Sequence, residues 1–165
     1  MSQLKESFIR MIGEHEKLIF RISHCYTSGQ ADREDLYQEI VLQCWKAWPQ
    51  FSGLSKPGTW LYRVALNTAI SHRRRESRRP RVSGLDLEVL SRAAEEHSDQ
   101  GQLQLMYRLI AALPPLERAL LLLYFEDRPY ADIAEIMGIS ASNVATRLGR
   151  IRNKLKQQVS LSEYY

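Results

Sequence analysis

The stretch YADIAEIMGISASNVATRLGRIRNKL, residues 130–155, has the pattern of two helices joined by a glycine turn. Gly138 is suited to the left-handed conformation that ends a helix, and Ser140 is suited to cap the helix that follows. Small or apolar residues recur at helical spacing in the first segment: Ile133, Ala134 and Met137. The second segment repeats apolar residues that we expect to be buried: Val144, Leu148, Ile151 and Leu155.

The opposite face of the second segment is polar and basic. Its residues are Asn143, Thr146, Arg147, Arg150 and Asn153. Amide, hydroxyl and guanidinium groups on one helix face suit contacts with phosphates and base edges in a major groove. The alternative is a solvated, charged surface helix of the kind that many soluble proteins carry. Ala134, which is small where two helices cross, and the length of the turn at Gly138 favour a DNA-reading helix-turn-helix.

The overall composition agrees with a polyanionic partner but does not demand one. The 165 residues carry a net charge of +4, and the pI is about 9.2. Because this excess is small, the distribution of the basic residues matters more than their total. A hydrophobic content of 44% allows one modest core or two small ones.

Several classes of protein are disfavoured. Cys25 and Cys44 lie in apolar helical patterns without CxxC spacing, so we interpret them as buried thiols of a cytoplasmic protein. No apolar run is long enough to span a bilayer, and the start MSQLKESFIR lacks the core of a signal peptide. Phosphate-binding glycine loops and HExxH spacing are missing, so an enzyme is the weaker hypothesis, and we expect neither a metal nor another cofactor.

The first half of the chain predicts helices. A 3.6-residue period from Leu4 to Tyr26 predicts one long helix with apolar positions Leu4, Phe8, Met11, Ile12, Ile19, Ile22 and Tyr26. Asp32 is suited to cap a second helix, which Pro49 stops. The apolar side of that helix comprises Leu36, Ile40, Cys44, Trp45 and Trp48. Its polar side comprises Asp35, Gln38, Glu39, Gln43 and Lys46.

A third helix is expected from about Thr59 to about Ser77, after a loop at residues 50–58. One stripe of it combines an aromatic residue with polar and basic ones: Trp60, Arg63, Asn67 and Arg74. Trp60 on that stripe suits stacking on unpaired bases, and it equally suits packing against Trp45 or Trp48. The tract HRRRESRRPR, residues 72–81, adds six arginines that attract a nucleic-acid backbone.

The sequence therefore predicts an all-α fold of two small helical domains joined by a flexible acidic linker. Residues 1–81 form a three-to-four-helix bundle, and residues 82–101 are the linker, which is rich in Asp and Glu. Residues 102–165 form a four-helix domain whose helix-turn-helix spans about 129–155. In this second domain, a short helix precedes Pro114 and Pro115, and the strongly apolar LERALLLLYF follows them.

Two motif sets in this order resemble a known family. DLYQEIVLQCWKAWPQF (35–51) is followed by TWLYRVALNTA (59–69) and, after the linker, by LPPLERALLLLYFEDRPYADIAEIMGISASNVATRLGRIRNKLK (113–156). Together they resemble an RNA polymerase sigma factor of the extracytoplasmic-function (ECF) group of the sigma-70 family, over nearly the whole chain. The resemblance implies a region-two domain at residues 1–81 and a region-four domain at residues 102–165.

This resemblance also implies partners and contacts. The polar face of the second helix matches the surface that docks on the clamp helices of the polymerase largest subunit: Asp35, Gln38, Glu39 and Gln43. Region four is expected to meet the flap of the second subunit. The residues that match the contacts with the opened minus-ten element are Leu54, Ser55, Lys56, Trp60, Arg63, Asn67, Arg73, Arg74 and Arg75. Those that match the reader of the minus-thirty-five element are Ser140, Asn143, Ala145, Thr146, Arg147 and Arg150.

The family further implies an anti-sigma factor as a regulator, and a cytoplasmic protein that such a regulator can hold at the membrane without inserting into it. The expected function is promoter selection by core polymerase and help in opening the duplex, without catalysis. Two alternatives remain. One is a stand-alone helix-turn-helix regulator whose first half serves dimerisation or ligand binding. The other is a sigma-derived adaptor that binds polymerase but does not melt promoters.

Overall fold

The computed structural model describes residues 2–78 and 107–162. The expected linker at 82–101 therefore lies outside the described residues, as do Arg79, Arg81 and the start of the helix expected at 102–113. Within the described ranges every regular element is helical, which confirms the all-α prediction. The elements are α1 (Ser2–Glu14), α2 (Glu16–Tyr26), α3 (Gln30–Ala47), the 3-10 turn η1 (Trp48–Gln50), α4 (Pro57–Arg78), α7 (Pro115–Phe125), α8 (Tyr130–Met137) and α9 (Ala141–Ser162).

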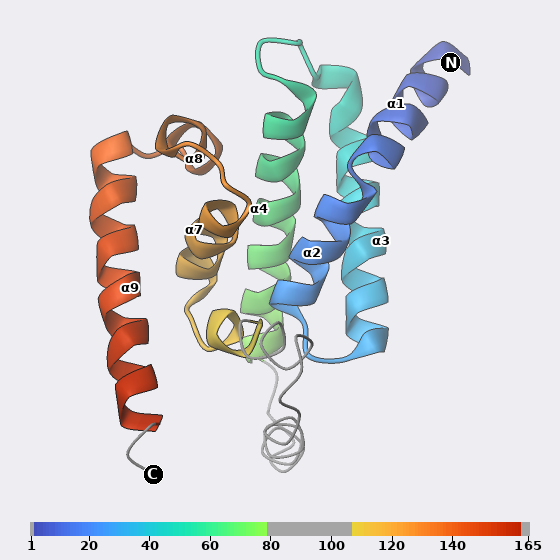
Figure 1. Ribbon diagram of the computed structural model, residues 1–165. Helices are drawn as coiled ribbons and strands as arrows, with labels where there is room; N and C mark the ends of the chain where they lie inside the picture. The colour runs from blue at the N-terminus through green and yellow to red at the C-terminus, as the bar shows by residue number, and fades with distance from the viewer. Residues whose placement is uncertain (1, 79–106, 163–165) are drawn as a thin grey trace.

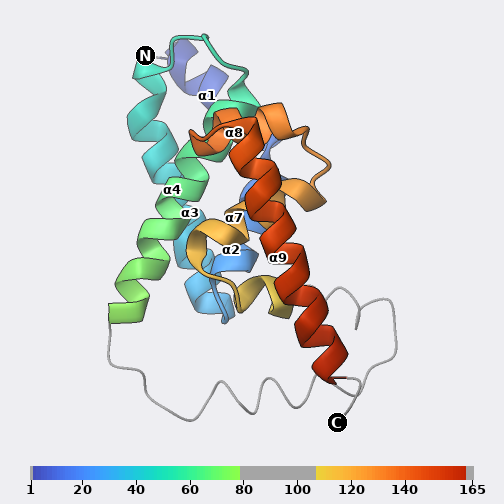
Figure 2. The same cartoon turned by 90° about the vertical axis from the view of Figure 1, so that its left-hand side faces the viewer.

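Helix α4 lies at the centre of the molecule, between α1–α3 on one side and α7–α9 on the other (Figure 1). It packs against α2 and α3 and also against α7 and α8. The buried apolar side chains of both halves form one continuous core. Figure 2 looks onto the outer side of the C-terminal half, where α9 lies in front of α7. No helix in the described part of the chain is long and apolar enough to cross a membrane.

The single helix expected from Leu4 to Tyr26 is wrong, because the chain breaks it at His15 into α1 and α2. His15 has φ −117° and ψ 16°, and its Nδ1 lies 2.8 Å from the Met11 carbonyl oxygen. Gly58 at the start of α4 faces the imidazole so closely that a Cβ there would lie 3.2 Å from Nε2. The break therefore lets the start of α4 approach the N-terminal helices. Of the apolar positions in this pattern, Leu4 is 38% exposed, whereas Phe8 and Met11 are buried.

The start of α3 also differs from the expectation. Asp32 does not cap the helix, because Gly29 occupies the capping position and its carbonyl oxygen accepts from the Arg33 N–H at 3.0 Å. Asp32 instead lies in the first turn, where the negative charge of an acidic side chain interacts favourably with the helix dipole. The other end agrees better: α3 ends at Ala47, and Pro49 lies within the short turn that follows. On the predicted apolar side, Leu36, Ile40 and Cys44 are buried, Trp48 is half-buried, and Trp45 is 37% exposed.

The helix-turn-helix has the predicted geometry. Gly138 is left-handed with φ 69°, and its N–H donates to the Ala134 carbonyl oxygen at 2.9 Å. The Ser140 hydroxyl oxygen accepts from the Asn143 N–H at 3.1 Å, which caps α9. Val144, Leu148 and Ile151 are buried and Leu155 is half-buried. In α8, Ile136 is buried together with Ile133, although the predicted apolar stripe did not include it.

Candidate nucleic-acid interface

The polar stripe predicted on α4 is a surface stripe. Arg63, Asn67 and Arg74 are exposed, whereas the rest of the helix surface is largely buried. Leu61 and Ala65 face the N-terminal core, and Tyr62 and Leu66 fall on a neighbouring stripe that is also buried. Burial of two adjoining faces leaves α4 one narrow polar surface, and the predicted residues occupy it.

Trp60 belongs to a cluster of aromatic rings at one end of this stripe. Its ring centroid lies 5.5 Å from that of Trp48, edge to face, and 5.3 Å from that of Phe51. Packing against Trp48, one of the two alternatives for Trp60, is therefore confirmed. Because Trp60 is half-buried, part of its ring also remains accessible beside Arg63 and Asn67. The cluster fixes the ring in place, as a stacking platform requires.

The loop between η1 and α4 presents Leu54 to solvent. Gly53 has φ 74°, a left-handed conformation that a side chain would strain, and the turn that it makes leaves Leu54 95% exposed. Lys56 is exposed too, and its carbonyl oxygen accepts from the Trp60 N–H at 3.1 Å in the first turn of α4. Ser55 is half-buried. A side chain this exposed buries almost no surface in the folded chain, so it is accessible to a partner.

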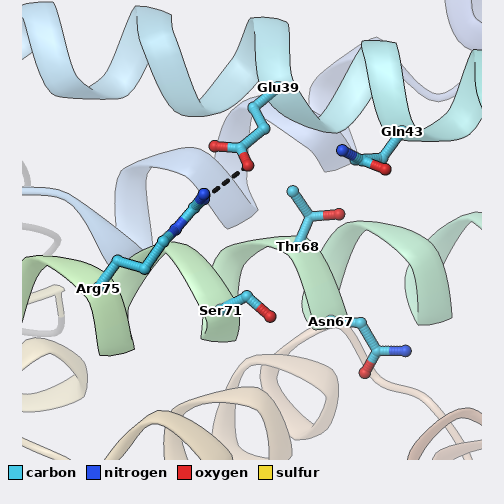
Figure 3. A pocket seen from close by; sticks show the side chains of 6 residues that line it. All are labelled: Glu39, Gln43, Asn67, Thr68, Ser71 and Arg75. Carbon is cyan, nitrogen blue, oxygen red and sulfur yellow. Dashed lines mark hydrogen bonds and ion pairs between the residues drawn. The ribbon is translucent and has the colours of Figure 1, made fainter.

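A groove of about 410 Å³ runs between α3 and α4 (Figure 3). The residues that line it all have polar side chains: Glu39, Gln43, Asn67, Thr68, Ser71 and Arg75. The Arg75 guanidinium donates to the Glu39 carboxylate at 2.6 Å, and His72 Nδ1 lies 3.5 Å from the same carboxylate. The groove thus joins side chains from the two surfaces that the sequence assigned to different partners. Ser71, one turn after Asn67, was missed, although helical spacing places it on the same stripe.

The acidic and amide face of α3 divides into two parts. Asp35 and Gln38 are exposed, whereas Glu39 and Gln43 are half-buried at the groove. The first pair is therefore free to meet a large partner. The second pair lines the groove, and Glu39 is already held by Arg75.

The three consecutive arginines on α4 do not form a single patch. Arg74 is exposed on the polar stripe, and Arg75 pairs with Glu39. Arg73 is half-buried and lies near Arg118 in the C-terminal half. Burial, and after it the charge of Arg73, lowers the pKa of Arg118. Only Arg74 points freely to solvent, because helical geometry turns each successive residue by about 100°.

The second predicted surface lies on α9. Ala145, Thr146, Arg147 and Arg150 are exposed. Asn143 Oδ1 accepts from Arg147 Nε at 3.0 Å, and the Thr146 hydroxyl donates to the Ser142 carbonyl oxygen at 3.0 Å. The Asn143 contact orients the guanidinium before any ligand is present. The Ser140 hydroxyl is used as the cap, so its first role is to begin the helix.

Two family models match the two halves of the chain. Residues 11–79 match the family model "Sigma-70 region 2", and residues 103–155 match "Sigma-70, region 4". The chain is 31% identical to the ECF RNA polymerase sigma factor SigG of Mycobacterium tuberculosis over 82% of its length, and it spans 44% of that relative. It is 30% identical to the ECF RNA polymerase sigma-E factor of Escherichia coli, with 87% of this chain and 81% of the relative aligned.

A solved structure of similar fold is the sigma factor RpoE of Bartonella quintana in complex with the anti-sigma factor NepR. Its TM-score is 0.65 at 19% identity, and the match covers 97% of this chain and 98% of that one. That structure agrees in fold, and the two family matches define a two-region sigma-70-type protein. The chain belongs to the ECF group of RNA polymerase sigma factors, a class that acts in transcription initiation.

Proposed function

We propose that this protein directs core RNA polymerase to a specific set of promoters and assists their opening, without catalysing a covalent change. Family membership supports the class of function, and the observation that carries the proposal is the pair of polar surfaces on α4 and α9. One chain thus presents two helical faces whose side chains suit nucleic-acid binding. A stand-alone regulator with a helix-turn-helix would need only the face on α9.

In this proposal the chain divides as its sequence suggests. Residues 1–81 bind polymerase and the opened minus-ten element, residues 82–101 connect, and residues 102–165 bind the upstream duplex. Asp35 and Gln38 make the outer contact with the clamp helices, because both are exposed on α3. Glu39 and Gln43 contribute from the edge of the groove. The C-terminal half meets the flap of the second subunit.

In this proposal, α4 and the loop before it open the promoter. Leu54, Ser55 and Lys56 capture a base flipped out of the stack, and Trp60 offers a ring held by its aromatic neighbours. Arg63 and Asn67 contact the separated strand next to it. Of the arginines 73–75, the two exposed ones, Arg74 and Arg75, supply charge towards the backbone. Holding unstacked bases lowers the free energy of the open state, which is how a protein melts a duplex without chemistry.

The α9 face reads the minus-thirty-five element in a major groove. Arg147 and Arg150 provide charged donors, and Asn143 and Thr146 lie on the same face. Ser140 and Ala145 lie near the start of the helix, where a recognition helix approaches the bases. Each good base contact is worth roughly 1–3 kcal/mol of discrimination.

An anti-sigma factor is the expected regulator. The support is that the similar fold of RpoE is known in complex with the anti-sigma factor NepR. Such a regulator would hold this protein in the cytoplasm, or at the membrane when the regulator is itself anchored there.

Run-off transcription tests the proposal. Purified bacterial core polymerase, without its usual specificity subunit, is mixed with this protein and fragments of the source genome. New transcripts should start at a small set of sites that share two upstream elements, and core polymerase alone should give none. A protein that binds polymerase but yields no specific starts would instead be an adaptor, and the proposal would be wrong.

A further inference from the structure

All three tryptophans of the chain, Trp45, Trp48 and Trp60, belong to one cluster of aromatic rings. Trp48 is its centre. Its ring centroid lies 5.2 Å from that of Phe51, nearly parallel at 13°, and 5.5 Å from that of Trp60, edge to face. Both arrangements are favourable for aromatic pairs at this separation. The position of the Trp60 ring therefore depends on where Trp48 lies.

Trp48 lies at the point where α3 passes into the three-residue turn η1. In a 3-10 turn the side chains of residues i and i+3 lie one above the other, which explains why Trp48 and Phe51 stack. The Phe51 N–H donates to the Trp48 carbonyl oxygen at 3.0 Å and closes the turn. Helix ends fray more readily than helix interiors, so the neighbouring rings matter more for the position of this indole.

A further neighbour of Trp48 comes from the N-terminal helix α1. The Phe8 ring centroid lies 5.9 Å from that of Trp48 and 5.0 Å from that of Trp45. Phe8 is 7% exposed, and the buried residues of α1 are Phe8 and Met11. Both views of the molecule place α1 at the same end as the loop that precedes α4 (Figure 1 and Figure 2). Phe8 thus anchors α1 on the aromatic cluster.

The contact of Phe8 with Trp48 reaches the DNA-facing surface of α4 in two steps, because Trp48 in turn touches Trp60. The roles proposed for this chain do not use Phe8, and the match to the region 2 family model begins only at residue 11. A smaller side chain in place of the phenyl ring would leave Trp48 a space to move into. Trp60 would then lose a fixed neighbour.

We propose that Phe8 is a positioning residue for promoter opening: through Trp48 it keeps the Trp60 indole in the orientation in which an unpaired base stacks on it. Phe8 is buried, so it acts through Trp48 and does not itself contact DNA. A ring that is already oriented loses less conformational freedom when a base stacks on it, which favours the opened strand. The inference rests on the proposed function, since it requires Trp60 to receive a base.

Four variants test this role. Phe8→Leu removes the ring but keeps an apolar side chain, so the variant should fold. The matched control is Met11→Ala, which truncates the other buried side chain of α1 and should destabilise the protein at least as much. Trp48→Leu removes the central ring, and Trp60→Leu shows the full effect of losing the stacking ring.

The first readout needs neither polymerase nor DNA. The chain has three tryptophans, so its NMR spectrum holds three indole N–H signals, and the Trp60 signal is the one that Trp60→Leu removes. Phe8→Leu should shift or broaden the Trp60 signal through Trp48, and Met11→Ala should leave it in place. An unmoved Trp60 signal in Phe8→Leu would overturn the proposal, whatever the protein does with polymerase.

The second readout separates promoter binding from promoter opening, which is followed by permanganate reactivity of unpaired thymines over time. With core polymerase and a promoter found by run-off transcription, Phe8→Leu should slow opening roughly three- to tenfold, the loss expected from one weakened aromatic contact. Its affinity for core polymerase and for the closed promoter should stay unchanged. Trp48→Leu should slow opening at least as much, and Met11→Ala should open at the wild-type rate.

The failures of the two proposals differ in these data. Wild-type opening by Phe8→Leu beside slow opening by Trp60→Leu would overturn this inference alone. Equal losses in Phe8→Leu and Met11→Ala would overturn it too, because they would show a general effect of α1 on stability. Wild-type opening by Trp60→Leu would overturn the stacking role in the proposed function, and the positioning role of Phe8 with it.

Discussion

The Arg75 guanidinium donates to the Glu39 carboxylate at 2.6 Å across the groove between α3 and α4 (Figure 3). The sequence assigned Glu39 to polymerase binding and Arg75 to DNA, and the structure pairs them. Each side chain therefore satisfies the other when no partner is bound. Arg75 is 59% exposed at its side chain, so the pair is weak enough to be exchanged for contacts with a partner.

Glu39→Gln should change the two proposed activities in opposite directions. Loss of the carboxylate removes a polymerase contact and leaves Arg75 unneutralised, so affinity for core polymerase should fall while affinity for single-stranded DNA rises about two- to fivefold. Fluorescence anisotropy with each partner measures both. Arg75→Gln is the matched variant, which should weaken DNA binding and leave polymerase binding unaltered. Equal losses of both activities in both variants would show a purely structural pair.

Leu54→Ala should separate stability from promoter opening. Because the side chain is 95% exposed, the free energy of unfolding should change by less than about 0.5 kcal/mol. Open complexes, detected by permanganate reactivity of unpaired thymines, should nevertheless decrease. Ser52→Ala, an exposed change in the same loop, should leave opening intact. Normal opening by Leu54→Ala would remove the loop from the proposed mechanism.

On α9, Arg147→Ala should reduce discrimination between the correct upstream element and a single-base variant by roughly 1–3 kcal/mol if Arg147 reads a base. The control is Lys154→Ala, which removes the same charge from the same helix on the side that faces Glu117 at 3.7 Å. Promoter binding at several salt concentrations measures both. A uniform loss over all sequences, with a smaller salt slope, would assign Arg147 to phosphate contact instead.

Two glycines in the C-terminal half predict opposite effects of the same substitution. Gly138→Ala should destabilise by about 1 kcal/mol because its φ of 69° is strained for a residue with a Cβ, although nothing lies within 4 Å of that Cβ. Gly149→Ala, inside α9 and equally unobstructed, should stabilise by about 0.5–1 kcal/mol. Denaturant titration compares them. If both substitutions have the same sign, the turn is not held as described.

The helix-turn-helix could be predicted from sequence because its signals are local. A glycine with positive φ and a capping serine lie within a few residues of the helices that they join, and the period of Val144, Leu148 and Ile151 gives the buried face. The exposed stripe on α4 followed from the same period. The sequence pattern therefore predicts the structure correctly where the structure depends on residues that are close in sequence.

The features that the sequence did not reveal depend on distant residues. The break at His15 involves Gly58, which is more than forty positions away. The pairing of Glu39 with Arg75 crosses two helices, and the burial of Tyr62 depends on Arg128 in the other half. Helical periodicity shows which residues share a face but not which face another helix covers. For this reason the split of Arg73, Arg74 and Arg75 among three environments was not foreseen.

The central claim is that this chain is a specificity subunit of RNA polymerase, and binding to purified core enzyme tests it most directly. Labelled protein should bind the core enzyme saturably. Alanine at both Asp35 and Gln38 should weaken binding at least tenfold, because both side chains are exposed on the polar face of α3 that we propose as the docking surface. Glu135→Ala, at an exposed acid on α8, should bind as wild type. No binding by the wild-type chain, or equal binding by all three proteins, would contradict the account.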